Sequence, residues 1–323
     1  MRIFLKYIKN FFRDEKDTVK EKPFNWKTHL ITALFLGICI YLNYGLDYGE
    51  YASFYERMIH INYKSLESIL YLFLFYALPF LFIILFIALL KGSRTLLQPN
   101  YIIYALIGLL FLSLDSSYYI MQYANEWFSD NPYIYGWAHA CFSNLSSTLT
   151  VIIPLYILYF FSRTFHPEWY GFALNGAKVR PYLWLILFMI PLIYLASLRP
   201  DFLEEYPTYI DHFEYEHMRL EQWQTAGIYE LCYGFDFISV ELFFRGFLVV
   251  GLSRIVGKEA ILPMVVVYCF LHFGKPAGEA ISSIFGGYIL GILAYASRNI
   301  FGGLIAHLGV AWGMEFLAFI QTN

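Results

Sequence analysis

The chain has 323 residues, of which 59% are hydrophobic and only 15% are charged. Soluble globular proteins contain about 45–50% apolar and about 25% charged residues, so this balance excludes a soluble cytoplasmic enzyme. The abundance of apolar and aromatic residues also excludes a disordered chain. The net charge is −3 and no basic face is clustered, so we expect no nucleic-acid partner. The composition predicts an all-α, polytopic helical membrane protein.

Residues 1–26 form a basic segment ahead of the first apolar run. In MRIFLKYIKNFFR, apolar residues at helical spacing alternate with lysine and arginine. This pattern is typical of an amphipathic helix that lies on an anionic membrane surface, and a short basic tail would have the same composition. We expect this segment to be cytoplasmic and to contact membrane lipids.

The rest of the chain contains apolar stretches of the length that crosses a bilayer, about 20 residues. Nine are expected as transmembrane helices: residues 28–46, 66–90, 101–122, 136–161, 182–198, 226–251, 260–274, 279–297 and 302–320. The seventh and the ninth are the least sharply bounded.

The charges between these stretches alternate in sign along the chain. Residues 123–135 contain no lysine or arginine, and the loop at 199–225 is rich in acidic residues, whereas the intervening turns are basic. Because positive loops stay in the cytoplasm, the N-terminus is expected inside and the C-terminus outside. Residues 27–225 then hold the N-terminal transmembrane helices with the acidic outer loop 199–225, and residues 226–323 form the C-terminal part.

Ionisable residues within the apolar stretches gather in the last hundred residues. Such residues are costly in lipid, so they are usually paired or line a cavity. The set comprises Glu230, Asp236, Glu241, Arg245, His272, Glu279, His307 and Glu315, with Asp115 in an earlier stretch. Glu241 and Arg245 are four residues apart and can pair on one helix face, either to lock two helices together or to build a site.

The two histidines have different settings. His272 closes a short apolar helix, and Gly274, Pro276 and Gly278 then interrupt the chain. Non-helical backbone at membrane depth must be buried or line a wet cavity, so the turn after His272 is expected to dip into the bilayer, although a simple interfacial histidine fits the same pattern. His307 opens the last helix, with Glu315 two turns further on roughly the same face.

Three segments together resemble the CAAX protease and bacteriocin-processing (CPBP or Abi) family of intramembrane proteases. The family pattern is Glu-Glu-x-x-x-Arg, then Phe-x-x-x-His, then His-x-x-x-Asn or Asp, on three membrane helices. This chain reads Val240-Glu241-x-x-x-Arg245, then Tyr268-x-x-x-His272, then His307-x-x-x-Ala311. The resemblance covers about residues 226–320, and it implies a protease core at residues 226–323.

The resemblance implies a bacterial inner-membrane protease that hydrolyses a membrane-associated peptide or protein. Two of the family's polar positions are apolar in this chain: Val240 replaces the glutamate that acts as the base, and Ala311 replaces the motif-three asparagine or aspartate. Activity would then require a shifted carboxylate, either Asp236 one turn before Val240 or Glu315 one turn after Ala311. The candidate catalytic residues are Glu241, Arg245, His272, His307, Asp236 and Glu315.

Several alternatives stay open at the level of the sequence. A divalent metal such as zinc could be held by His272, His307 and Glu241, or the chemistry could proceed on carboxylates alone. Because Val240 and Ala311 are not polar, the chain could instead be a non-catalytic scaffold that binds a membrane partner. Polar residues on several helices could also line a proton-coupled transport path.

Overall fold

The computed structural model describes residues 25–61, 65–128, 131–165, 169–173, 179–211 and 213–322. In these ranges the chain folds into helices without a strand, and a single bridge between Tyr48 and Tyr51 is the only extended pairing. The all-α prediction is therefore confirmed. The surface helix expected near the N-terminus falls on residues 1–24, outside the described part of the chain.

Each of the nine expected apolar stretches coincides with a helix or a run of consecutive helices. The α-helices are α2 (Trp26–Tyr44), α3 (Phe54–Ile61), α4 (Leu66–Lys91), α5 (Pro99–Ser116), α6 (Met121–Phe128), α7 (Pro132–Ser147), α8 (Ile153–Phe161), α9 (Arg180–Ala196), α10 (Pro200–Glu205), α11 (Glu214–Met218), α12 (Gln222–Glu241), α13 (Ser253–Val256), α14 (Ile261–Leu271), α15 (Ala277–Ser297) and α16 (Phe301–Thr322).

Within the described ranges, five helical stretches are long and apolar enough to cross a membrane. They are Leu66–Lys91, Pro99–Ala124, Pro132–Phe161, Ala277–Ser297 and Phe301–Thr322. The expected seventh span, α14, has only 11 residues, and α12 carries three carboxylates along its length. The protein is thus an integral membrane protein, and nine crossings remain a prediction.

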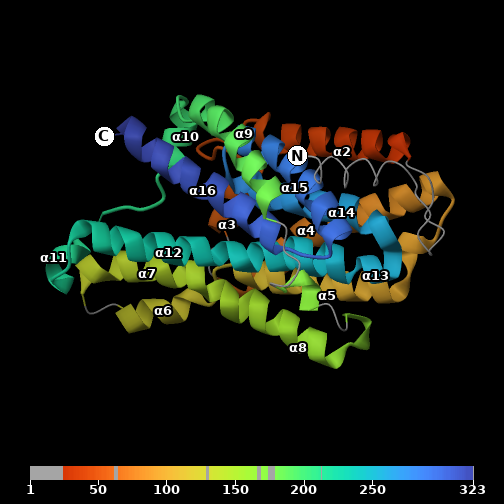
Figure 1. The fold of residues 1–323 in the computed structure, drawn as a ribbon, viewed down its shortest axis with the longest axis horizontal. Helices are drawn as coiled ribbons and strands as arrows, with labels where there is room; N and C mark the ends of the chain where they lie inside the picture. Colours follow the sequence, from red (N-terminus) through yellow and green to blue (C-terminus); the bar gives the residue numbers. More distant parts are fainter. Residues whose placement is uncertain are drawn as a thin grey trace.

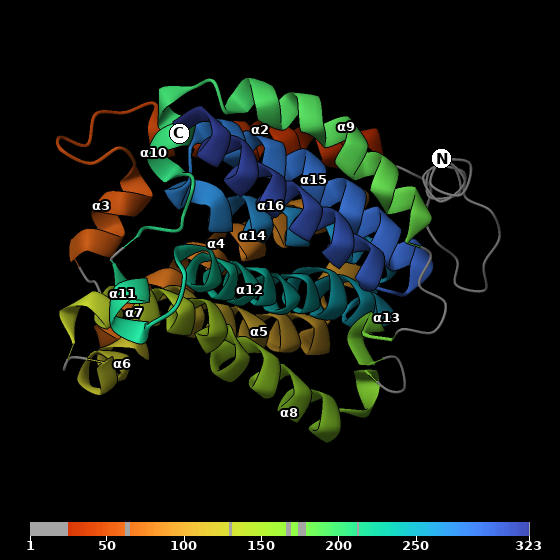
Figure 2. The ribbon, with the colours of Figure 1, turned by 60° about the vertical axis from the view of Figure 1, so that its left-hand side comes forward.

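Helix α12 runs along the middle of the molecule with α7 on one side and α16 on the other (Figure 1). Helix α14 packs against both α15 and α4, and α9 covers α16 (Figure 2). The largest apolar core joins α4 and α5 to the segment after α12 and to α14. The N-terminal helices and the C-terminal part therefore share one core around the polar residues.

Two stretches of wide π-helix interrupt the α-helices near the middle of the molecule. One, η2 (Thr148–Ile152), joins α7 to α8, and the other, η5 (Leu242–Gly251), continues α12. Every residue of η5 is buried. Gly246 allows this close packing, because a Cβ atom there would lie 2.8 Å from the backbone oxygen of Tyr170. Short π-helical segments are frequent at functional sites, and η5 contains Arg245.

Candidate active site

Glu241 stands at the centre of a polar network at the end of α12. Its side chain is 0% exposed, and its Oε1 atom lies 3.0 Å from Arg245 Nη1 and 2.9 Å from His307 Nδ1. The ion pair expected from the spacing of Glu241 and Arg245 is thus present. The other oxygen, Oε2, has no hydrogen-bond partner among the described residues and faces Gly303, where a Cβ atom would lie only 2.7 Å away. Glu241 is therefore enclosed on both sides by protein.

Arg245 is also fully buried, and it is held by charge rather than by a set of hydrogen bonds. Its guanidinium carbon lies 4.2 Å from the centre of the Tyr268 ring, a cation–π contact. None of its side-chain nitrogens makes a well-aligned hydrogen bond to a described residue. Because a buried cation without partners is costly, Glu241 and Tyr268 together compensate the burial of Arg245.

His307 connects the carboxylate to a tyrosine on another helix. Its Nδ1–H donates to Glu241 Oε1, so the neutral ring has its lone pair on Nε2. The hydroxyl of Tyr268 lies 3.2 Å from that Nε2 and donates to it. The ring of Phe237 packs edge-on against the imidazole at a centroid distance of 4.6 Å. These contacts fix both the tautomer and the orientation of His307.

His272 lies on the other side of Tyr268. Its Nδ1–H donates to the Tyr268 backbone oxygen at 2.8 Å, and the two rings are 4.5 Å apart. In the neutral ring this leaves the lone pair of Nε2 facing away from that bond. Tyr268 connects the two histidines, because its backbone oxygen contacts His272 and its hydroxyl contacts His307.

The turn after His272 is held by contacts to the N-terminal helices α2 and α3. The Tyr44 hydroxyl donates to the backbone oxygens of His272 and Lys275, and Asn43 donates to that of Phe273. Gly274 lies against the ring of Tyr55, where a Cβ atom would be 2.8 Å from a ring carbon. These contacts anchor the turn to α2 and α3, with Phe273 buried and Gly274 itself exposed.

Asp236 lies one turn before Val240 and close to this network. Its Oδ1 accepts a hydrogen bond from Ser239 at 3.1 Å, and it is near enough to His307 for electrostatic interaction. Unlike Glu241, its side chain is only partly buried. Asp236 is thus a second carboxylate near His307, on a residue that is less deeply buried than Glu241.

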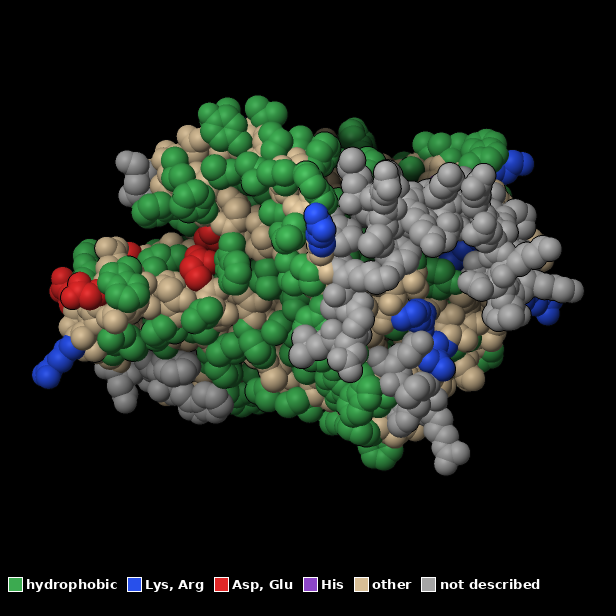
Figure 3. Space-filling model, in the orientation of Figure 1, with side chains coloured by type: hydrophobic (Ala, Val, Ile, Leu, Met, Phe, Trp, Pro, Cys, Tyr) green, Lys and Arg blue, Asp and Glu red, His purple; other side chains and the backbone are tan. Residues whose placement is uncertain are grey.

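Glu315 is placed elsewhere. Its two oxygens accept hydrogen bonds from the backbone and the hydroxyl of Thr208, at 2.9 and 2.8 Å. Nearby, Tyr206 donates to Glu279, and Lys275 pairs with Glu205. Figure 3 shows acidic side chains near α11 at the left-hand end and over the left part of α12. The structure therefore assigns Glu315 to anchoring the acidic loop at 199–225 and does not bring it to the histidines.

Val240 and Ala311, the two positions that depart from the family pattern, also lie in apolar surroundings. Val240 packs against the main core, and Ala311 is buried. No described group of three histidine, cysteine or acidic side chains is arranged to hold a metal ion. Both ring nitrogens of His307 are already engaged by Glu241 and Tyr268. The set His272, His307 and Glu241 does not fit a zinc site in this arrangement, since each ligand must offer a free lone pair.

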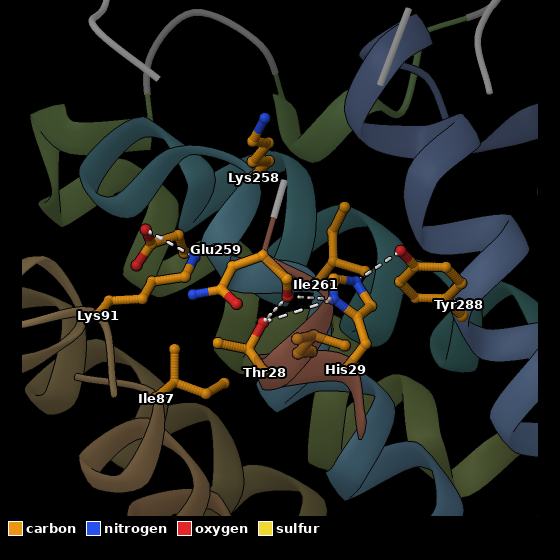
Figure 4. Close-up of a pocket in the computed structure, with 10 residues that line it drawn as sticks. Thr28, His29, Ile87, Lys91, Lys258, Glu259, Ile261 and Tyr288 are labelled. Carbon is orange, nitrogen blue, oxygen red and sulfur yellow. Dashed lines mark hydrogen bonds and ion pairs between the residues drawn. The ribbon is translucent and has the colours of Figure 1, made fainter. Parts of the chain in front are cut away.

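A separate small pocket lies at the opposite end of α14 (Figure 4). There His29 Nε2 lies 2.8 Å from the Tyr288 hydroxyl, and Lys91 pairs with Glu259 at 3.1 Å. None of the candidate catalytic residues lines it. The polar network around Glu241 is therefore distinct from this pocket.

Comparison with known families gives one match. Residues 231–313, about a quarter of the chain, match the family described as type II CAAX prenyl endopeptidase Rce1-like. This segment of the chain is similar to the CAAX prenyl endopeptidase family. The match contains Asp236, Glu241, Arg245, His272 and His307, so the CAAX protease segment coincides with the polar network. No curated protein and no solved structure matched the chain.

Sequence reasoning missed one contributor to this polar network and one hydrogen bond between α5 and η2. Tyr268 was noted only for its place in the second motif, yet its hydroxyl links the histidines; a tyrosine where the family has phenylalanine was the available signal. Thr150 donates to Asp115 at 2.5 Å on the neighbouring helices. A threonine within an apolar run gives no signal by itself, because its partner is 35 residues away.

Proposed function

We propose that the protein is an intramembrane endopeptidase that hydrolyses peptide bonds of a membrane-associated peptide or protein with carboxylate-activated water. The observation that carries this proposal is the Glu241–His307–Tyr268 network inside the CAAX protease segment, with the partly exposed Asp236 beside it. In this proposal the N-terminus is cytoplasmic and the membrane is a bacterial inner membrane.

Asp236 is the proposed general base. Glu241 is less suited to this role, because its Oε1 is shared by Arg245 and His307 and its side chain is inaccessible. Glu241 instead positions His307, as an orienting carboxylate does for a catalytic histidine. Asp236 takes the role of the base that Val240 cannot fill, from one helical turn away.

In the proposed reaction, Asp236 accounts for the one proton that is transferred. Asp236 accepts a proton from water while the water oxygen attacks the carbonyl carbon of the peptide. The tetrahedral intermediate then breaks at the C–N bond, and the protonated Asp236 returns its proton to the leaving nitrogen. The lone pair on His272 Nε2 can accept a hydrogen bond from the attacking water, so His272 suits the positioning of water better than the stabilisation of an oxyanion.

The test is a cleavage assay in proteoliposomes with a library of membrane peptides. The wild type is compared with Asp236→Asn and His272→Ala, and Asp201→Asn serves as control because Asp201 lies in an exposed pair with Arg199. Loss of a general base typically lowers the rate by about 10²–10⁴-fold. The proposal predicts that order of loss for Asp236→Asn and wild-type rates for Asp201→Asn. Equal cleavage by wild type and Asp236→Asn would overturn it.

A non-catalytic scaffold is the second candidate, and the apolar surroundings of Val240 and Ala311 favour it. A scaffold would bind a hydrophobic peptide through the same segment without cutting it. Val240→Glu separates the two functions, since it returns a carboxylate to the vacated position. Cleavage by Val240→Glu but not by wild type would support the scaffold.

A further inference from the structure

A pocket lined by two lysines lies where α14 begins, at the end of this helix remote from the candidate active site (Figure 4). Lys91 is the last residue of α4, and Lys258 and Glu259 lie in the short turn η6 (Gly257–Ala260) that precedes α14. Lys91 Nζ lies 3.1 Å from Glu259 Oε1, and the two side chains are mostly buried, at 14% and 12% exposed. Two lysines and one glutamate give the pocket wall a net charge of +1 when His29 is neutral.

The first turn of α2 closes the other side of the pocket. His29 Nε2 accepts a hydrogen bond from the Tyr288 hydroxyl at 2.8 Å, and His29 Nδ1 lies 3.1 Å from the backbone oxygen of Asn25. The Thr28 hydroxyl donates to that same oxygen at 2.8 Å. These bonds tie α2 to α15 and fix this part of the wall. A ligand would therefore be held by the ammonium groups of the lysines, each of which has three N–H donors.

The surface beside the pocket is apolar on two helices. Leu30 and Leu34 near the start of α2 are exposed, and so are Phe86, Leu89 and Leu90 near the end of α4. Helix α2 packs against α4, and α4 is one of the helices long and apolar enough to cross a membrane. The pocket thus lies at the end of a membrane-crossing helix, at the depth where lipid headgroups meet the hydrocarbon core.

The sequence around the pocket predicts the leaflet that it faces. Arg94 follows α4, Arg254 lies in α13 just before η6, and the segment before α2 is basic. Positively charged segments stay on the cytoplasmic side of a membrane, and the cytoplasmic leaflet carries the anionic phospholipids. Basic pockets between membrane helices on this side are suited to anionic headgroups.

We propose that this pocket binds the phosphate group of an anionic phospholipid of the cytoplasmic leaflet, held by Lys258 and Lys91, with the acyl chains on the apolar surface of α2 and α4. The hollow has a volume of about 30 Å³, room for about one water-sized group, so one phosphate oxygen fits inside and the others stay at its mouth. So small an enclosure beside Glu259 gives a free anion little affinity, whereas a lipid also buries its acyl chains against the protein. The proposal does not rest on the proposed peptidase function.

The test measures lipid retention by the full-length protein in native mass spectrometry. The protein in detergent is titrated with dioleoylphosphatidylglycerol or with dioleoylphosphatidylcholine, which have the same acyl chains and differ in headgroup charge. We expect one molecule of phosphatidylglycerol to be retained at a lower lipid concentration than phosphatidylcholine. Equal retention of the two lipids would overturn the proposal.

Charge variants locate the bound lipid. Lys258→Gln should weaken the retention of phosphatidylglycerol about fivefold, the factor that one lysine near an anionic surface contributes, and Lys258→Arg should keep it. Glu259→Gln removes the negative charge of the pocket wall and should strengthen retention by about the same factor. Arg199→Gln is the matched control, because it removes one positive charge from an exposed residue outside the pocket. Equal affinities of Lys258→Gln and Arg199→Gln, or unchanged retention by Glu259→Gln, would contradict the site.

Inorganic phosphate distinguishes a lipid headgroup from a free anion. It is added to the complex of wild-type protein and phosphatidylglycerol at the concentrations used for the lipid. A lipid site predicts that the phosphatidylglycerol stays bound. Its displacement by inorganic phosphate would assign the pocket to a free anion and overturn the proposal.

Discussion

The hydroxyl of Tyr268 lies 3.2 Å from Nε2 of His307, and this bond joins the second and third motifs of the site across two helices. The same ring lies against Arg245 on one side and His272 on another. Tyr268 thus contacts three of the candidate catalytic residues. The arrangement makes it the residue through which a change at one histidine would reach the other.

Tyr268→Phe removes this bond and keeps the ring. The fold should tolerate the change, because the ring still packs on Arg245 and the loss of one hydrogen bond costs about 1 kcal/mol. The freed Nε2 of His307 is expected to lower kcat in the cleavage assay with little change in KM. Thermal unfolding in detergent gives the stability effect, and unchanged kcat would show that the hydroxyl has no catalytic part.

Glu241→Ala should destabilise the protein by about 3–5 kcal/mol, because it leaves Arg245 buried without its counter-charge. Thermal unfolding in detergent measures the loss. The matched control is the double variant Glu241→Leu with Arg245→Met, which replaces both charges with apolar groups and should recover much of the stability. A single variant as stable as wild type would contradict a buried pair.

Gly303→Ala tests the enclosure of Glu241. A Cβ atom at residue 303 would lie 2.7 Å from Glu241 Oε2, so the carboxylate must shift, at a cost of about 1–3 kcal/mol. Gly286→Ala on the neighbouring helix is the control, since a Cβ atom there would meet nothing within 4 Å. We expect a lower Tm for Gly303→Ala alone. Equal Tm values for both variants would show that Glu241 is not enclosed at that side.

Lys275, in the turn before α15, gives a pH-dependent prediction. Burial by itself lowers the pKa of this ammonium group, but the carboxylates of Glu205 and Glu279 outweigh it and raise the pKa above its ordinary value. A raised pKa contributes stability below the unfolded value, about 10.4, and the contribution disappears as the pH rises through the folded value. The Tm difference between wild type and Lys275→Gln should therefore be constant near neutral pH and shrink above about pH 10. A difference that stays constant through strongly alkaline pH would contradict the pairing.

The sequence predicted the all-α membrane fold because apolar length and charge scarcity leave few alternatives. The Glu241–Arg245 pair followed from helical spacing, and the three motifs indicated the resemblance to the CAAX protease family. Other features depended on contacts between distant segments. The binding of Glu315 to Thr208 joins residues 107 positions apart, and no local pattern announces it. The π-helical course of η5 likewise has no signal in its sequence, since the residue composition of that stretch fits an ordinary apolar helix.

The number of crossings illustrates the same limit. Hydropathy located nine apolar stretches correctly as helices. Whether the short α14 and the carboxylate-bearing α12 cross the bilayer depends on how the C-terminal part packs. A helix enclosed by other helices does not need the length or the apolar surface of one that faces lipid. The sequence pattern alone does not separate these two cases.

The central claim is that Asp236, beside the Glu241–His307–Tyr268 network, activates water for peptide hydrolysis. Its most direct test is cleavage of a membrane-peptide library by the reconstituted protein, with Asp236→Asn compared with wild type at equal folded amounts. We expect wild type to produce defined cleavage products and Asp236→Asn to slow their formation by about 10²–10⁴-fold. Identical products at identical rates from both proteins would contradict the claim.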